Sequence, residues 1–221
     1  MRFMSLAATI LLALALAANP SQAGAAGMQD DVNQAVSIIE RFQEIPEQSI
    51  PLSVLKDAKG LAILTVVKAG FIFSGRGGTG VVVARTGKTW TGPSAIGTGG
   101  AGFGLQIGAQ VTEFVIVLNT QEALKAFSRG GNVALGTDLS VAAGPVGRTV
   151  AADITPIAAV YTYSRSQGLF AGVSLEGTVI VTRNEANSGY YGKAVNPEDI
   201  LAGRIKPPAG AQALIKVLRK H

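Results

Sequence analysis

Cysteine is missing from this chain, and histidine occurs only once, as the last residue, His221. Without cysteine there is no disulfide, no thiol nucleophile and no lipid-modified cysteine. With one terminal histidine, neither a serine nucleophile with its usual base nor a zinc site of known ligand spacing is indicated. These absences argue against an enzyme, and neither a cofactor nor a metal is expected.

Charged side chains are scarce, since Asp, Glu, Lys and Arg make up 15% of the residues. A catalytic pair of carboxylates stays open in principle, but strands and turns separate the candidates, so capping or ion pairing is the favoured interpretation. The candidates are Glu113, Asp138, Asp153 and Glu176. An enzyme acting through carboxylates is therefore the least favoured function.

The N-terminal apolar run, from Leu6 to Ala18, is shorter than the roughly 20 residues that span a bilayer. Arg2 precedes this run and Ser21-Gln22-Ala23 follows it, which is typical of a secretory signal peptide cleaved after Ala23. The sequence therefore predicts a signal peptide over residues 1–23 and a single domain over 24–221. The protein is expected to be periplasmic or secreted, with peripheral membrane contact as a further option.

Basic residues outnumber acidic ones by 19 to 14, but they form no run longer than Arg219-Lys220. This scatter is typical of a solvated surface, and nucleic acid is not an expected partner. The excess permits weak attraction to an anionic phospholipid surface, at about 1 kcal/mol for each basic residue close to the membrane. An oligomeric state is not indicated.

Glycine is abundant at the centre of the chain, where Gly70 to Glu113 contains thirteen of the 28 glycines. Gly75-Arg76-Gly77-Gly78-Thr79-Gly80 lies between apolar runs and predicts a tight turn between two strands. The same residues match the G-x-G-x-x-G pattern of dinucleotide sites, but that chemistry needs a helix directly afterwards, and Val81-Val82-Val83 continues as strand.

Helical patterns lie near both ends of the chain. Apolar residues recur at helical spacing at Val32, Val36, Ile39 and Phe42. This pattern favours a helix that begins at Val32, is capped by Asp30 or Asp31, and covers the core. Membrane insertion of the apolar stripe is the alternative. Helices are also expected over 121–127, from Pro197, and over a closing segment with Leu214, Ile215 and Leu218 inward.

The remaining segments are expected to supply strands and one loop. Strands are predicted over 61–67, 103–111, 114–118, 139–143, 158–163, 169–173 and 179–182, and a polar loop with an exposed Tyr190-Tyr191 over 184–192. The expected fold is α+β, a strongly bent antiparallel sheet or partly closed barrel, rich in glycine and packed with N- and C-terminal helices.

Five basic residues lie at or beside glycine turns and strand ends. If those turns gather at one rim of the sheet, guanidinium groups and glycine amides there would accept phosphate; the alternative is an ordinary solvated surface. The five are Arg76, Arg85, Lys88, Arg148 and Arg165.

Five motifs follow one another in the sequence. They are WTGPSAIG over 90–97, QIGAQ over 106–110, FVIVLN over 114–119, AGPVGR over 143–148 and YSRSQGLFAGVSLEG over 163–177. With these motifs the chain resembles the SYLF domain, also called the Ysc84-type domain, from about Ile50 to the closing helix.

The resemblance implies a binding function. Eukaryotic members of that family bind phosphoinositide-containing membranes and, in the yeast-like branch, actin filaments; the lipid-binding part includes an amphipathic N-terminal helix. By resemblance Val32 to Ile45 takes that role here. Since no SH3 or FYVE module is seen and a signal peptide is predicted, a bacterial envelope protein is expected, and actin binding is not.

The favoured hypothesis is a non-enzymatic domain that binds anionic phospholipid through Arg and Lys at the glycine turns and through the amphipathic helix. A structural or protein-interaction module of the periplasm without lipid specificity is the alternative.

Overall fold

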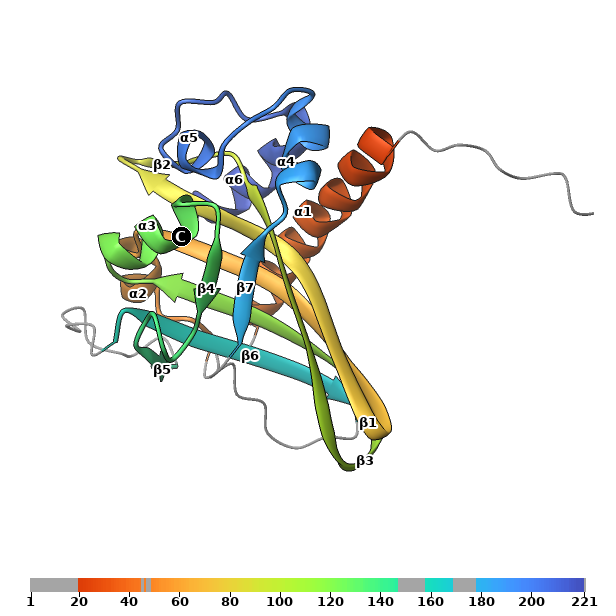
Figure 1. The fold of residues 1–221 in the computed structure, drawn as a ribbon. Coiled ribbons are helices and arrows are strands. Elements are labelled where there is room, and N and C mark those ends of the chain that lie inside the picture. Colours follow the sequence, from red (N-terminus) through yellow and green to blue (C-terminus); the bar gives the residue numbers. More distant parts are fainter. Residues whose placement is uncertain (1–19, 45, 47–48, 147–157, 169–177, 221) are drawn as a thin grey trace, which may run out of the picture.

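Two very long antiparallel strands, β1 (Gly60–Thr86) and β3 (Ser94–Leu118), form the frame of the fold (Figure 1). The computed structural model describes residues 20–44, 46, 49–146, 158–168 and 178–220. The two strands pair from Gly60 opposite Leu118 to Val82 opposite Ser94. The turn between them lies at Gly87, in a left-handed conformation with φ 59°, and the short strand β2 (Thr89–Trp90) pairs back onto the end of β1.

The β1–β3 pair curls until the two halves of β1 touch. Gly80 lies directly on the other half of its own strand: a Cβ there would overlap the carbonyl oxygen of Ile63 and lie 2.5 Å from Cα of Leu64. Gly78 is similarly placed, because a Cβ built on it would lie 2.5 Å from the Thr65 carbonyl oxygen. Only glycine permits backbones to approach this closely.

The predicted turn at Gly75 to Gly80 is therefore wrong. The chain runs straight through it as part of β1 and turns at Gly87 instead. Gly78 and Gly80 serve close packing between two halves of a bent strand, a long-range contact that local turn preferences do not reveal.

Four further strands complete a curled mixed sheet. β6 (Val160–Gly168) pairs antiparallel with the C-terminal half of β3, and β5 (Val141–Ala143) lies parallel to β6. β7 (Val179–Thr182) pairs with the other half of β3, and β4 (Asn132–Ala134) pairs with β7. The predicted α+β class and bent sheet are confirmed, with β5 as the parallel exception.

Alternating side chains of the long strands supply two hydrophobic clusters, one on each face. Leu61 and Ile63 belong to the cluster that contains α1 (Pro20–Glu44), α2 (Leu52–Asp57) and α6 (Gln212–Leu218), with α4 (Asn184–Tyr191) packed on α1. Ala62 and Leu64 belong to the cluster covered by α3 (Gln121–Ser128) and α5 (Pro197–Leu201). A short 3-10 helix, Ala209–Ala211, leads into α6.

Several local predictions are confirmed. Thr120 caps α3 by accepting a hydrogen bond from the Ala123 amide, Pro197 opens α5, and Leu214, Ile215 and Leu218 are buried on α6. The strand predicted over 179–182 is β7, whereas the one predicted over 169–173 lies outside the described residues.

Two predicted boundaries are wrong. α1 begins at Pro20 rather than Val32, so Asp31 lies inside the helix and its carboxylate contacts the sheet instead of capping. Residues 184–191 form α4 rather than a polar loop. The polar sequence of α4 misled the prediction because its polar side chains bond inside the fold. Asn187 is fully buried and bonds the Ala95 amide and the Ser94 hydroxyl, and Tyr191 donates to the Pro93 carbonyl.

Among the described residues, the helices are all too short or too polar to cross a membrane.

Candidate lipid-binding surface

The apolar stripe of α1 lies against the sheet. Val32, Ile39 and Phe42 are 0%, 1% and 8% exposed, and Val36 packs half-buried against the same cluster. Burial of this stripe confirms the cover helix that the sequence favoured. In this arrangement the stripe does not reach the surface.

Two clasps hold the polar flanks of α1 to the sheet. In the first, Asp31 accepts hydrogen bonds from the Thr79 hydroxyl at 2.6 Å and the Arg183 guanidinium at 2.7 Å. In the second, Arg41 Nη2 lies 2.5 Å from Glu113 Oε1, and Glu113 is 7% exposed. Because burial outweighs the opposing contacts of Thr79 and Arg183, the pKa of Asp31 is raised above its ordinary value.

Arg85 joins three elements near the C-terminus of the chain. Its guanidinium lies 4.2 Å from the centre of the Trp90 ring, and Nη2 donates to the Leu55 carbonyl of α2 at 2.7 Å. Trp90 in turn donates its indole N–H to the Leu218 carbonyl of α6. Burial lowers the pKa of Arg85, and the nearby Asp57 carboxylate acts in the opposite direction.

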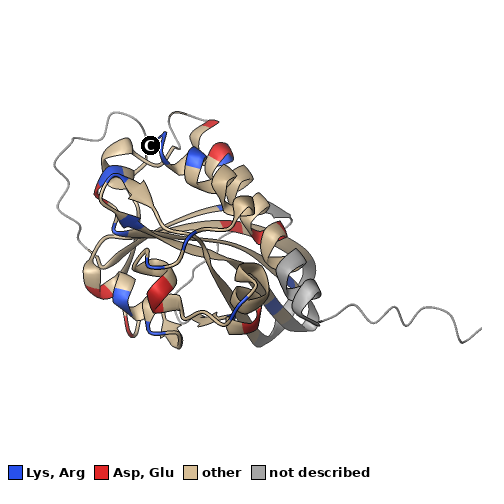
Figure 2. Ribbon diagram, turned by 90° about the horizontal axis from the view of Figure 1, so that it is seen from above, with Lys and Arg blue, Asp and Glu red and all other residues tan. Residues whose placement is uncertain are grey.

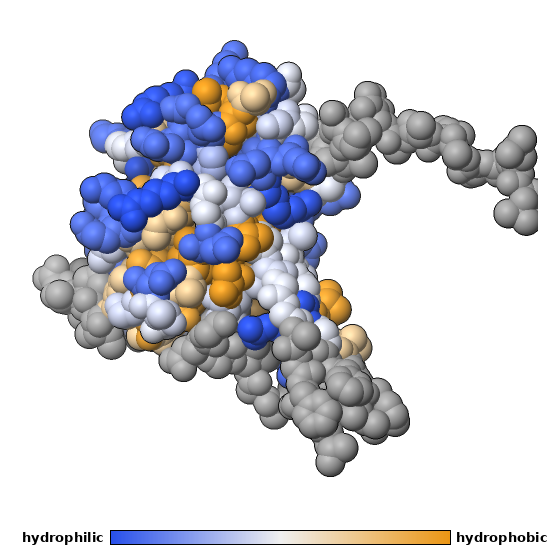
Figure 3. Space-filling model, in the orientation of Figure 1, coloured by the Kyte–Doolittle hydropathy of each residue, from blue (hydrophilic) through white to orange (hydrophobic). Residues whose placement is uncertain are grey.

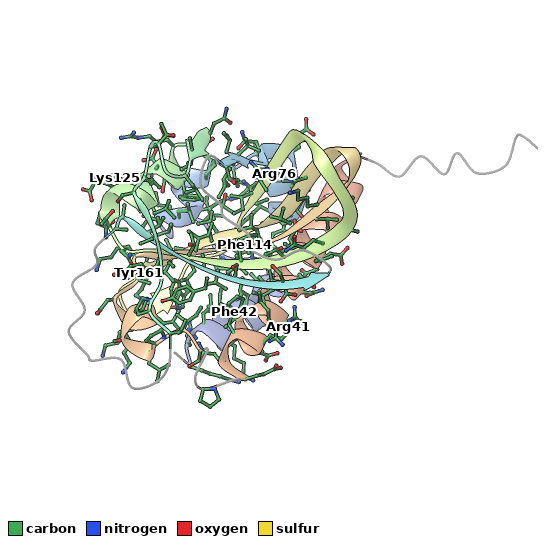
Figure 4. All side chains as sticks on the ribbon, turned by 90° about the horizontal axis from the view of Figure 1, so that it is seen from below. Arg41, Phe42, Arg76, Phe114, Lys125 and Tyr161 are labelled. Atoms are coloured by element: carbon green, nitrogen blue, oxygen red, sulfur yellow. The ribbon has the colours of Figure 1, made fainter. Side chains whose placement is uncertain are left out.

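The other predicted cations lie elsewhere. Arg76 stands nine positions before Arg85 on β1, beside Gly100, while Arg165 on β6 donates to the Arg41 carbonyl at 3.2 Å. Figure 4 shows Arg76 and Arg41 on opposite sides of the sheet. Arg148 lies outside the described residues.

Of the predicted five cations, the structure thus brings together only Arg85 and Lys88, at the β1–β2 turn. The four predicted cations that the structure describes do not gather at the single rim expected from the sequence. The reason is that Gly75 to Gly80 is strand, so Arg76 is not at a turn beside the others.

A different basic surface, which the sequence analysis missed, surrounds that turn. The Arg85 amide donates a hydrogen bond to the Lys59 carbonyl at 2.9 Å, and the Arg219 guanidinium donates to the Thr89 hydroxyl at 2.7 Å. These bonds hold the segment after α2, the β1–β2 turn and the end of α6 together. We call this surface the cationic end. It consists of Lys56, Lys59, Arg85, Lys88, Arg219 and Lys220.

Figure 2 shows Lys and Arg segments around the C-terminal end of the chain. Four side chains of the cationic end are exposed: Lys56, Lys88, Arg219 and Lys220. The Asp57 carboxylate lies near enough to Arg85 to raise its pKa, against the effect of burial. The local signals were Arg219-Lys220 and the predicted pair Arg85 and Lys88; Lys56 and Lys59 were not predicted, and the three segments join only through the pairing of distant parts of the chain.

The two described members of the four candidate carboxylates have structural partners. Glu113 pairs with Arg41, and Asp138 accepts the Ala134 amide at 2.7 Å. Asp153 and Glu176 lie outside the described residues. Within the part of the chain that the structure describes, acidic side chains and histidine nowhere gather in a group of three that would hold a metal.

Comparison with known proteins matches residues 99–221 to the Ysc84 family model, described as "Las17-binding protein actin regulator". The chain is 52% identical over 180 residues to LAS seventeen-binding protein 3 of Saccharomyces cerevisiae, covering 79% of this chain and 39% of that protein. It is 46% identical over 200 residues to human SH3 domain-containing YSC84-like protein 1, covering 86% and 58%. No solved structure matches the chain.

These relatives overturn one expectation. Actin binding was not expected from the sequence, but the family description and the relatives' names point to actin-related protein partners. The expectation was wrong because it rested on the predicted signal peptide and on the lack of an SH3 or FYVE module rather than on the domain itself. The chain spans about two fifths to three fifths of the length of the curated relatives it matches.

The curled glycine-rich sheet, its cover helices and the extent of these matches lead to one conclusion: the chain belongs to the Ysc84 family of SYLF domains, a family of binding and adaptor domains.

Proposed function

We propose that this domain catalyses no reaction and binds anionic phospholipid surfaces through the cationic end. One observation carries the proposal: hydrogen bonds join three distant segments around the β1–β2 turn, and these segments carry six basic residues, with the Asp57 carboxylate near Arg85. Phosphate head groups suit such a surface because guanidinium and ammonium groups bind them by charge and hydrogen bonds.

The expected binding is weak and sensitive to salt. Each basic residue near an anionic membrane contributes about 1 kcal/mol, from which the cost of association is subtracted. Salt screens exposed charges beyond a Debye length of about 8 Å at physiological ionic strength. On the face seen in Figure 3, hydrophobic surface occurs as separate patches among polar side chains, which favours contact by charge over broad insertion there.

Insertion of the α1 stripe into a membrane stays a prediction, and it would require α1 to leave the sheet. Of the α1 side chains that the structure describes, six lie in the core: Met28, Val32, Ala35, Ile38, Ile39 and Phe42. Exposing the larger ones costs about 1.5–3 kcal/mol each, so the total is comparable to the roughly 5–15 kcal/mol that stabilises a whole domain. We therefore propose that the cationic end contacts the membrane first and that any insertion of α1 follows.

The test is sedimentation with vesicles of phosphatidylcholine and phosphatidylserine at low and high salt. Lys88→Gln with Lys220→Gln removes two charges from the cationic end, and binding should fall roughly tenfold to thirtyfold, from about 1 kcal/mol per charge. Lys125→Gln with Arg129→Gln removes two exposed charges from α3 and its C-terminus and serves as the matched control. Equal losses in both double variants, or binding that salt leaves unchanged, would refute the proposal.

A protein partner is the second candidate, favoured by the names of the relatives, which describe binding to Las17 and regulation of actin. The same cationic end would suit an acidic protein surface. Detergent separates the two functions, because a protein complex isolated from cell extract survives it and attachment to lipid does not.

Export is a separate part of the proposal. We infer that residues 1–23 direct the chain out of the cytosol and are removed, which places the domain in the periplasm or outside the cell. N-terminal sequencing of the protein from the exported fraction should begin at Gly24. A chain that keeps residues 1–23 and stays in the cytosol would contradict this.

A further inference from the structure

A pocket of about 330 Å³ opens between α1, β5 and β6, away from the cationic end. Phe42 from α1 and Tyr163 from β6 line it together with Ala143 and Val146 from the end of β5 and the residues after it. Two guanidinium groups, Arg41 and Arg165, also line it. This volume is at the small end of the range for ligand sites, roughly 300–1,000 Å³.

The apolar wall is fixed by close packing. Gly144 lies so near the Tyr163 ring that a Cβ there would overlap it, and the Tyr163 hydroxyl donates to the Pro145 carbonyl at 3.0 Å. Burial raises the pKa of Tyr163, so its hydroxyl stays protonated and keeps this bond. Val146 is 54% exposed, an apolar side chain in contact with both solvent and the pocket.

The two arginines differ in how firmly they are held. Arg41 forms two hydrogen bonds with the buried carboxylate of Glu113, so its charge is already matched. Arg165 Nη1 donates to the Arg41 carbonyl at 3.2 Å and lies 3.7 Å from Glu44 Oε2, and the side chains of Arg165 and Glu44 are 38% and 60% exposed. Because such an exposed ion pair contributes little, the Arg165 guanidinium is available to an acidic ligand.

We propose that this pocket binds one acidic amphiphile, with its anionic head on Arg165 and the first part of its chain on Phe42, Tyr163 and Val146. Figure 4 shows Arg41 and Phe42 side by side on α1, so cation and aromatic ring are offered from one turn of the helix. The ligand class is a fatty-acid carboxylate or a lipid phosphate monoester, since both combine an anion with a hydrocarbon chain. The inference extends the proposed lipid function to a single-molecule site built from other residues.

Isothermal titration of the full chain with monomeric octanoate and with a short-chain lysophosphatidate tests the pocket. Saturable binding of one molecule is expected, weakened about tenfold by Arg165→Gln, which removes a charge-assisted hydrogen bond. Ala143→Leu should weaken it too, by filling the pocket. Arg204→Gln, which removes an exposed arginine paired with Asp199 at 2.8 Å, is the control and should change nothing.

Each outcome decides the inference. Binding of octanoate alone, or of lysophosphatidate alone, supports it and identifies the head group, whereas no saturable binding of either overturns it. Binding that survives both Arg165→Gln and Ala143→Leu also overturns it, and Ala143→Leu answers the question if the arginine variant fails to fold. Vesicle binding by the cationic end is read from Lys88→Gln with Lys220→Gln, so the two proposals fail independently.

Discussion

Gly80 is a residue that cannot accept even a methyl group. A Cβ there would overlap the Ile63 carbonyl oxygen and the Leu64 backbone, neither of which can move without disturbing β1. We expect Gly80→Ala to lower the free energy of unfolding by about 3 kcal/mol or more, the upper range for overpacking. Denaturation in urea measures this change.

Gly75 provides the comparison on the same strand, since nothing lies within 4 Å of a Cβ built on it. Gly75→Ala should change stability by less than about 1 kcal/mol, and restricting the unfolded chain acts in its favour. If both glycines tolerated alanine equally, the contact between the two halves of β1 would be wrong.

Asp31 should make stability depend on pH in an identifiable direction. Because burial raises its pKa, the folded protein takes up this proton more readily than the unfolded chain. Lowering the pH from about 7 toward the ordinary value of about 4 should therefore stabilise the wild type relative to Asp31→Asn, which has no proton to take up. Melting temperatures of both proteins across this range measure the difference.

The neighbours of Asp31 define what the opposite result would mean. Thr79 and Arg183 favour the charged carboxylate, and Asp30 disfavours it. Should the wild type lose stability relative to Asp31→Asn as the pH falls, the ion pair with Arg183 rather than burial would dominate at this site.

Among the elements, α4 depends on one buried side chain. Asn187 bonds the Ala95 amide at 2.7 Å and the Ser94 hydroxyl at 3.1 Å, which fixes α4 against the start of β3. Asn187→Ala should cost about 2–4 kcal/mol because two buried polar groups lose their partner. Asn184→Ala, at the exposed start of the same helix, should be nearly neutral in the same thermal unfolding measurement.

The prediction of elements succeeded where the pattern is local and failed where a distant contact decides. Thr120 predicts α3, and the spacing of Val32, Val36 and Ile39 predicts α1, because caps and apolar stripes act within a few residues. Asn187 gives no such signal, since its partners lie 92 and 93 residues away in sequence. The same holds for Gly80, whose reason to be glycine lies across the fold rather than in a turn.

The candidate site was harder still to predict from the sequence. Arg85 and Lys88 were expected because they flank a glycine, but Lys56, Lys59, Arg219 and Lys220 join them only after the sheet curls and α6 packs on Trp90. Assembling the cationic end requires the tertiary structure.

At the scale of the whole molecule, a disulfide that locks α1 onto the sheet would distinguish membrane contact by charge from membrane insertion of α1. The chain has no cysteine, so Asp31→Cys with Thr79→Cys introduces a single possible disulfide between α1 and β1. We expect the oxidised protein to bind anionic vesicles within about twofold of the reduced one, since the cationic end is untouched. Sedimentation before and after reduction makes the comparison, with the cysteine-free chain under the same reductant as control.

Loss of binding in the oxidised protein, restored by reduction, would show instead that α1 has to leave the sheet. In that case the stripe of Val32, Ile39 and Phe42 enters the membrane as the sequence analysis suggested.

The long strands also determine how the molecule comes apart. Leu61 and Ala62 are adjacent in β1 yet belong to different hydrophobic clusters, and β3 alternates in the same way. Neither cluster can melt without pulling residues out of the other, because every second position of one backbone is anchored on each side. The domain should therefore absorb heat in one peak, with calorimetric and van't Hoff enthalpies equal, although it has two separate cores.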